Sequence, residues 1–206
     1  MKPFDQLATD EVIQTTATNL KQNGMEVFIV KNGEAAKNKV YELIPSGSEV
    51  MVMTSETLRT LGIEKEIQES GKFDAIKVKI SKMAENQARE KKMLGAAATY
   101  SIGSVHAITQ DGKVLVASNT GSQLPGYAYG SDQVVWVVGA QKIVSDINEG
   151  LKRIEEYIVP LESVRARKAY GLPEDWNTFV SKLLVFNREV NQQRIKIVIV
   201  KEILGF

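Results

Sequence analysis

The chain contains 206 residues, with 26 Lys and Arg against 25 Asp and Glu, a single histidine and no cysteine. A chain of this length buries roughly 70% of its unfolded surface, so one domain over residues 1–206 needs no disulfide or metal to fold. The lack of cysteine excludes disulfides, thiolate zinc sites and cysteine-ligated iron–sulfur clusters within this chain. We expect a single domain with no metal site and no other cofactor.

The formal net charge is +1, and no segment carries the dense basic stripe that steers nucleic acid, so nucleic acid is not an expected partner. The first residues, MKPFDQLATDEVIQ, contain acids and no apolar signal-like region. No apolar run has the length needed to cross a bilayer. These patterns predict a cytoplasmic protein without a membrane span.

The N-terminal region, residues 1–80, alternates between helix and strand patterns. A helix capped by Thr9 or Asp10 comes first, and strands at 25–30 and 49–53 flank a second helix, which together predict one βαβ unit. Short helices and a strand at 75–78 follow. This alternation favours a layered α/β/α fold with right-handed crossovers.

Polar residues follow the second predicted strand, where Thr54 and Ser55 precede a helix. Hydroxyls and free N–H groups at this edge of a sheet are suited to a ligand. The alternative is that Ser55 only caps the helix.

The central region, residues 81–160, begins with a predicted helix over 81–100 and continues with a hairpin. Asp111-Gly112 lies between β-rich runs at 104–109 and 113–118, and such a pair predicts a tight turn in which both residues have positive φ. The apolar run 134–138 predicts a strand buried on both faces. We expect the hairpin and this strand to share one mixed sheet.

Two loops of the central region provide further candidate ligand-binding residues. The segment after the hairpin, here called the rim loop, has backbone N–H groups and hydroxyls suited to a small anion, although an ordinary polar loop has the same composition. Gly139 and Lys142 follow the buried strand, and Lys142 is a candidate phosphate ligand. The rim loop consists of Ser118, Asn119, Thr120, Gly121, Ser122 and Gln123.

Asp146 and Glu149 have the spacing of a capping box for a helix that should end near Pro160. In the C-terminal region, residues 161–206, the basic segment 163–168 is either a surface helix or an anion-binding arginine cluster. Strands at 181–186 and 194–200 predict a hairpin-like arm. It would close the domain or dock on a second copy, which would make the protein a homo-oligomer.

Acid–base candidates are few: His106, Asp111, Asp132 and Glu189. The turn itself is expected to occupy Asp111. His106 is the candidate catalytic base, and the alternative is a half-buried, hydrogen-bonded histidine. Because residues 103–142 contain no glutamate, a glutamyl thioester mechanism is disfavoured.

The segments AITQDG at 107–112, AYG at 128–130, VVGAQKIV at 137–144 and LKRI at 151–154 resemble the LUD family, the lactate utilisation domain. The resemblance implies the fold shared by ribose-5-phosphate isomerases, glucosamine-6-phosphate deaminases and coenzyme A transferases. It also implies a part in oxidising L-lactate to pyruvate beside iron–sulfur partner proteins. His106 and Gln110 stand where many relatives have Asn and Glu.

We therefore expect an accessory, metabolite-binding component of lactate utilisation that binds a small anionic metabolite. The alternatives are an enzyme resembling sugar-phosphate isomerases or coenzyme A transferases, and an oligomerisation module. In the first two cases the ligand would lie among Thr54, Ser55, the rim loop, Gly139 and Lys142.

Overall fold

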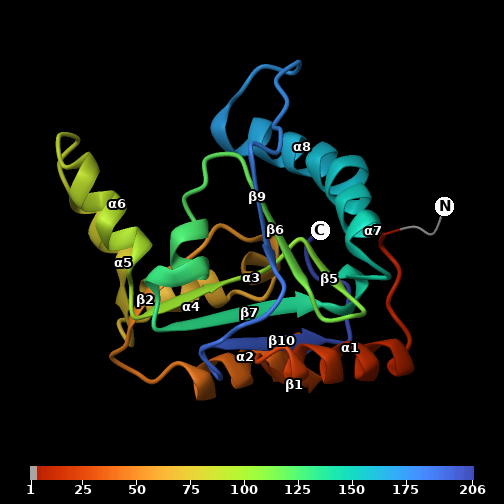
Figure 1. Cartoon of the computed structure of the whole chain (residues 1–206). Coiled ribbons are helices and arrows are strands. Elements are labelled where there is room, and N and C mark those ends of the chain that lie inside the picture. The colour runs from red at the N-terminus through yellow and green to blue at the C-terminus, as the bar shows by residue number, and fades with distance from the viewer. Residues whose placement is uncertain (1–3) are drawn as a thin grey trace.

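The structure is a computed structural model that describes residues 4–206, and its strands form two sheets (Figure 1). The larger sheet is wholly parallel, in the order β1-β10-β7-β4-β2-β3, and the smaller has the order β8-β5-β6-β9. In the smaller sheet β5–β6 and β6–β9 are antiparallel, whereas β5–β8 is parallel. The strands are β1 Glu26–Val30, β2 Glu49–Val52, β3 Asp74–Ala75, β4 Tyr100–Gly103, β5 Ala107–Thr109, β6 Val114–Ser118, β7 Gln133–Gly139, β8 Ile143–Val144, β9 Lys182–Phe186 and β10 Ile195–Val200.

Helices pack on the outer face of each sheet, and the first helix, Asp10–Gln22, packs with the residues between the sheets, which confirms the layered α/β class (Figure 1). Between Arg153 and Ile158 the chain forms a π-helical segment, η3, that joins α7 to α8. The helices are α1 Asp10–Gln22, α2 Gly33–Leu43, α3 Glu56–Thr60, α4 Ile63–Glu69, α5 Ile76–Lys82, α6 Ala88–Ala96, α7 Ile147–Lys152 and α8 Val159–Tyr170, with a π-helical turn η1 at Gly126–Gly130 and a 3-10 turn η2 at Ala140–Lys142.

Strand β7 lies at the centre of the core, as its apolar sequence predicts. Successive side chains point to opposite faces of a strand. Trp136 accordingly packs between the two sheets with β5, β6 and α1 residues, while Val135 and Val137 pack on the other face with α2, α3 and α4 residues. Every residue of β7 after Gln133 is buried, so this strand contributes to both cores.

The predicted helix caps are confirmed, because short polar side chains at these positions satisfy free N–H groups of the first turn. The Thr9 hydroxyl accepts from Val12, and the Ser55 hydroxyl accepts from Leu58 at 3.3 Å. Asp146 accepts from the N–H groups of Asn148 and Glu149.

The prediction of one mixed sheet was wrong, since the hairpin lies in the smaller sheet and β7 in the larger one. The hairpin strands are apolar on both faces, so they pack face to face with the larger sheet. The turn also differs: Gly112 has φ of +82°, but Asp111 does not have positive φ. Hydrogen bonds from Gly112 N to Thr109 O and from Thr109 N to Lys113 O, both 2.9 Å, define a longer loop that needs only one left-handed residue.

The two C-terminal strands are present, but they do not pair with each other. Strand β10 lies between β1 and β7, and β9 pairs with β6, so this segment completes both sheets of the domain. The sequence IKIVIV is buried at five of its six positions, which suits a central strand. Strands β1 and β2 are parallel, as a βαβ unit requires, with β10, β7 and β4 between them.

Three predicted element boundaries were wrong. The expected strand 75–78 is mostly α5, and the expected helix 81–100 contains the end of α5, a break, α6 and the start of β4. The helix expected to end near Pro160 continues to Tyr170. The π-helical segment η3 changes the hydrogen-bond register, so Pro160 falls in the first turn of α8, where a missing N–H costs little.

Candidate functional site

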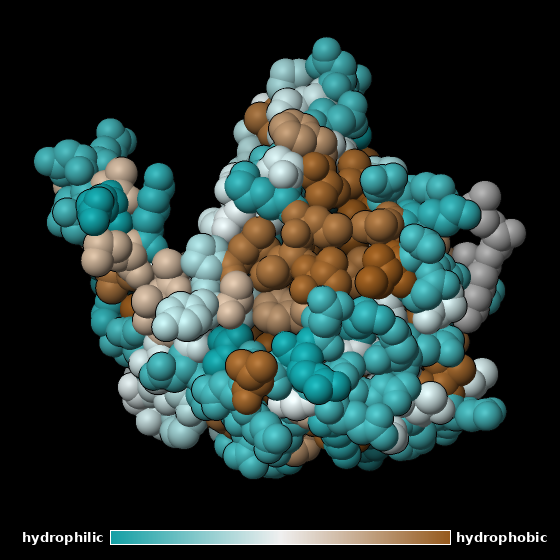
Figure 2. All heavy atoms as spheres, in the orientation of Figure 1, coloured by the Kyte–Doolittle hydropathy of each residue, from teal (hydrophilic) through white to brown (hydrophobic). Residues whose placement is uncertain are grey.

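A cavity of ≈ 440 Å³ lies where the two sheets meet η3 and α8. One half of its wall is polar and comes from the ends of β2, β4, β6 and η2. The other half is apolar and includes Ile154, Ile158, Trp176, Phe179 and Val180. Apolar atoms gather on this side of the molecule, beneath the segment that projects after α8 (Figure 2). The cavity therefore suits a ligand with one polar and one apolar end.

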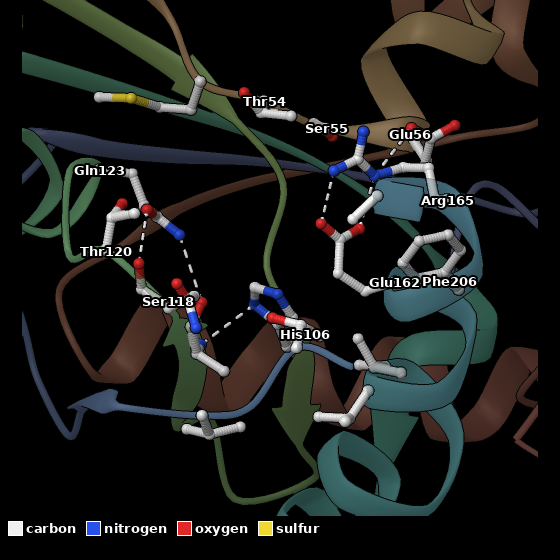
Figure 3. Close-up of a pocket in the computed structure, with 18 of the residues that line it drawn as sticks. Thr54, Ser55, Glu56, His106, Ser118, Thr120, Gln123, Glu162, Arg165 and Phe206 are labelled. Carbon is white, nitrogen blue, oxygen red and sulfur yellow. Dashed lines mark hydrogen bonds and ion pairs between the residues drawn. The ribbon is translucent and has the colours of Figure 1, made fainter. Parts of the chain in front are cut away.

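His106 lies at the polar end, between β4 and β5 (Figure 3). The Ala117 N–H donates to its Nδ1 at 3.2 Å, so the proton of the neutral ring is on Nε2. Burial, together with the positive charges of Lys142 and Arg153, lowers the pKa of His106 to about 3. At neutral pH the ring thus offers the cavity an N–H donor.

Lys142 reaches the same end from η2, and it is buried, with 2% of its surface exposed. Its Nζ donates to Thr57 Oγ1 at 3.1 Å, to Ser104 Oγ at 3.2 Å and to the Val105 carbonyl at 3.3 Å. Burial first, and then the charge of Arg153, holds the pKa of Lys142 well below its ordinary value.

Arg153 in η3 is fully buried and lies behind His106. Its Nη1 donates to the His106 carbonyl at 2.6 Å, whereas Nε and Nη2 have no hydrogen-bond partner among residues 4–206. Burial lowers its pKa to about 10, so the guanidinium stays charged at neutral pH. No carboxylate in the described chain forms an ion pair with Arg153 or Lys142, which leaves this end of the cavity positively polarised.

The rim loop is folded by its own hydrogen bonds (Figure 3). The Ser118 hydroxyl accepts from Gly121 N at 2.8 Å and donates to Gln123 Oε1 at 2.9 Å. Gln123 Nε2 in turn donates to the Ala117 carbonyl at 3.2 Å. These bonds hold the loop at the cavity edge and occupy several of its polar groups.

An ion-pair cluster faces this loop from α8 and α3 (Figure 3). Arg165 Nε and Nη2 donate to the Glu162 carboxylate at 2.7 and 2.6 Å, and Arg165 lies 3.7 Å from Glu56. Hydrogen bonding to Glu162 raises the pKa of Arg165. Because the two carboxylates already compensate its charge, this arginine is not a free anion ligand.

Nine of the predicted site residues are brought together by the cavity, and two are not. Those lining it are His106, Thr54, Ser55, Ser118, Asn119, Thr120, Ser122, Gln123 and Lys142. Gly121 and Gly139 do not line it. A Cβ on Gly139 would lie 2.2 Å from Gln141 Oε1 and 2.8 Å from the Glu202 carbonyl, so this glycine permits a close backbone approach. The role of all eleven in binding stays a prediction.

The other acid–base candidates lie outside the cavity wall. Glu189 pairs with Arg194 at 2.9 Å, and Asp111 is held in the hairpin turn by Thr109. Sequence reasoning missed Arg153, Ser104 and the aromatic side chains of the apolar half. Arg153 occurs in a helix with other charged residues, and nothing in the helical pattern distinguishes a buried arginine from an exposed one.

Within residues 4–206, no group of three or more His, Asp or Glu side chains is arranged to hold a metal ion. Over the same residues, none of the helices combines the length and apolar character that a bilayer crossing requires.

The two-sheet α/β domain, with a small-molecule cavity at the carboxyl ends of β2 and β4, is a setting in which α/β proteins bind metabolites. The family model of the LUD domain matches residues 13–171, most of the chain. The chain therefore belongs to the LUD domain family, which is associated generally with lactate utilisation.

A solved structure has the same fold. It is the crystal structure of a DUF162 family protein from Deinococcus radiodurans, with 12% identity and a TM-score of 0.57, and the alignment covers 95% of this chain and 99% of that one. No curated protein matches the sequence.

Proposed function

We propose that this protein is a metabolite-binding component of L-lactate utilisation, and that it binds a small carboxylate at the polar end of the cavity. The observation that carries the proposal is the pair of buried basic side chains, Lys142 and Arg153, without a carboxylate partner in residues 4–206. The Nε2–H group of His106 adds a neutral donor beside them.

The electrostatics favour an anionic ligand. An uncompensated buried charge is costly, and an anion that enters the cavity offsets that cost. Its charge also raises the pKa of Lys142, so binding is expected to be accompanied by proton uptake. A ligand without a negative charge gains neither effect.

Partner proteins follow from the chemistry of the family's pathway. Oxidation of lactate to pyruvate releases two electrons, and this cysteine-free chain has no thiolates with which to hold an iron–sulfur cluster. We therefore propose that it acts with iron–sulfur oxidoreductase proteins in the cytoplasm. Copurification of such proteins with the tagged chain, and poor growth on lactate after gene deletion, are the expected results; normal growth without any partner contradicts this part.

The binding part is tested by titrating L-lactate, pyruvate, ribose-5-phosphate and acetyl-coenzyme A against the wild type and Lys142→Met by calorimetry. Loss of a charge-assisted contact should weaken carboxylate binding at least ~10-fold, equivalent to about 1.4 kcal/mol. Lys77→Met is the matched control, because Lys77 also borders the cavity but pairs with Glu64 at 3.1 Å. Equal affinities in the wild type and a folded Lys142→Met protein would contradict the proposal.

An isomerase of the sugar-phosphate type has less support. With a carboxylate as the base, such chemistry needs a free Asp or Glu side chain at the cavity. The wall carboxylates Glu56 and Glu162 both interact with Arg165. A glutamyl thioester transferase would need one of them released from that arginine.

A further inference from the structure

We propose that Ser104 and Lys142 form a nucleophile–base pair that transfers the acyl group of an apolar carboxylic ester or thioester to Ser104. This activity goes beyond carboxylate binding and does not require lactate to be the natural ligand. The two side chains line the same cavity, and Ser104 Oγ lies 3.2 Å from Lys142 Nζ. Activation of a serine by a neighbouring base is the general requirement for such chemistry.

Lys142 Nζ has three hydrogen-bond contacts, and two of them require the amine to donate, which leaves the contact with Ser104 for its lone pair. Thr57 donates its own hydroxyl proton to the Leu204 carbonyl at 3.0 Å, so Thr57 Oγ1 can only accept from Lys142. The Val105 carbonyl likewise only accepts. A neutral amine uses its two protons for these partners, and its lone pair is then directed at the Ser104 hydroxyl.

The surroundings favour the neutral amine. Lys142 is buried, the charge that acts on it is that of the cation Arg153, and no carboxylate of residues 4–206 stabilises its ammonium form. A lysine in such a setting can act as a general base near neutral pH. An anion in the cavity would favour the ammonium form instead.

Ser104 differs from the other cavity serines in its hydrogen bonds. Ser118 is held in the rim loop by Gly121 and Gln123, Ser122 accepts from Thr120 at 3.1 Å, and Ser55 caps α3, so none of these three contacts a base. In the described chain, the only side-chain hydrogen bond of Ser104 is the one to Lys142. Its position after β4, at the carboxyl edge of the larger sheet, leaves its hydroxyl accessible from the cavity.

The reaction can be written in two balanced stages. Ser104 Oγ attacks the carbonyl carbon while its proton passes to Lys142 Nζ, and the carbonyl oxygen becomes an oxyanion that accepts a hydrogen bond from His106 Nε2–H. The carbon–oxygen or carbon–sulfur bond to the leaving group then breaks, and Lys142 returns the proton to the departing alcohol or thiol. In the second stage water attacks the acyl-serine with Lys142 as base, which releases the carboxylic acid and restores Ser104.

The apolar half of the cavity indicates the substrate class. Ile154, Ile158, Phe179 and Val180 offer a sugar or nucleotide no hydrogen-bonding group, and the ≈ 440 Å³ volume falls in the range of pockets that enclose much larger ligands than a three-carbon acid. An acyl chain of intermediate length would extend along Ile154, Ile158 and Val180, with its carbonyl at Ser104.

The test is covalent labelling followed by intact-mass and peptide-mapping mass spectrometry, with a fluorophosphonate probe and p-nitrophenyl hexanoate. We expect one adduct, on Ser104, that is absent from Ser104→Ala. Lys142→Met and Lys142→Arg should both slow labelling at least ~100-fold, because neither side chain can accept the proton. The wild-type labelling rate should rise with pH while that of the Lys142 variants stays flat.

Ser101→Ala is the matched control, because Ser101 is a buried serine in β4, three residues before Ser104, whose Oγ pairs with Ser131 at 2.7 Å. Labelling of this variant should equal that of the wild type. No adduct on the wild type up to pH 9.5, or an adduct that persists in Ser104→Ala, overturns the inference. Calorimetry of Ser104→Ala with the carboxylates separates the two proposals: retained binding without any acylation of the wild type leaves the proposed function intact and removes only the acyl transfer.

Discussion

The chain's one histidine provides a pH-dependence that can be assigned to a single group. The pKa of His106 is lowered from 6.5 to about 3 in the folded protein, by burial and by Lys142 and Arg153. Between these values the unfolded chain binds a proton that the folded chain does not, so folding stability is complete above pH 6.5 and falls as the pH decreases toward 3. A histidine whose pKa is raised by a neighbouring carboxylate has the opposite pH-dependence, with stability lost as the pH rises.

The magnitude follows from the width of the window. From pH 6.5 to pH 4.5 the loss approaches 2 pH units at ~1.4 kcal/mol each, or roughly 2.7 kcal/mol. Because the ring is partly exposed to the cavity, where water screens charges, we expect a loss of folding stability of about 2 kcal/mol. His106→Asn removes the titrating group while its Oδ1 can accept from Ala117 N–H in place of Nδ1.

Urea unfolding of the wild type and His106→Asn at pH 7.5 and pH 4.5 gives four free energies of unfolding. The wild type should lose about 2 kcal/mol more than the variant between the two pH values, since carboxylate titration is common to both and cancels. The proton spectrum supplies an independent readout, in which the folded histidine resonance should not titrate between pH 8 and pH 5. A midpoint near 6.5, or equal pH-dependence of the two proteins, would refute the reasoning.

Two further predictions concern packing and a buried ion pair. Gly103→Ala should lower stability by ~1–3 kcal/mol in chemical denaturation, because its Cβ would lie 1.7 Å from Tyr127 Oη. Gly95→Ala in α6, where the Cβ meets nothing closer than 3.6 Å, should be neutral or stabilising, and an equal loss in both would contradict this reading. Glu189→Gln should cost ~3–5 kcal/mol by leaving the buried Arg194 uncompensated, and replacing that arginine with Met as well should recover part of the loss.

Local signals in the sequence predicted most of the elements. Capping residues such as Thr9 and Asp146 satisfy free N–H groups within a few residues, and the burial of Val135 and Trp136 follows from an uninterrupted apolar run. These effects depend on neighbours in the chain, which is why pattern analysis detects them. The same reasoning placed Thr54, the rim loop and Lys142 at the ends of strands, and most of those residues line the cavity.

Properties that depend on distant contacts were not predictable. An apolar run shows that a strand is buried but not which sheet buries it, so the hairpin was assigned to the sheet of β7 and the C-terminal strands were paired with each other. The residues on either side of Arg153 in the sequence are those of an ordinary, solvent-exposed helix. Its burial arises because η3 packs against the smaller sheet, a contact that no local pattern encodes.

The site lies where the chain passes twice from the larger sheet to the smaller one, through residues 104–106 and through η2. Backbone carbonyls leave the sheet hydrogen-bond ladder at such crossings and need other donors. Lys142 supplies one to Val105 and Arg153 supplies one to His106. A neutral amide would satisfy each carbonyl without a buried charge, and Arg153 retains Nε and Nη2 that no group in residues 4–206 accepts from. The fold thus accounts for a donor at each position but not for two basic side chains, and a negatively charged ligand or a developing oxyanion supplies the missing reason.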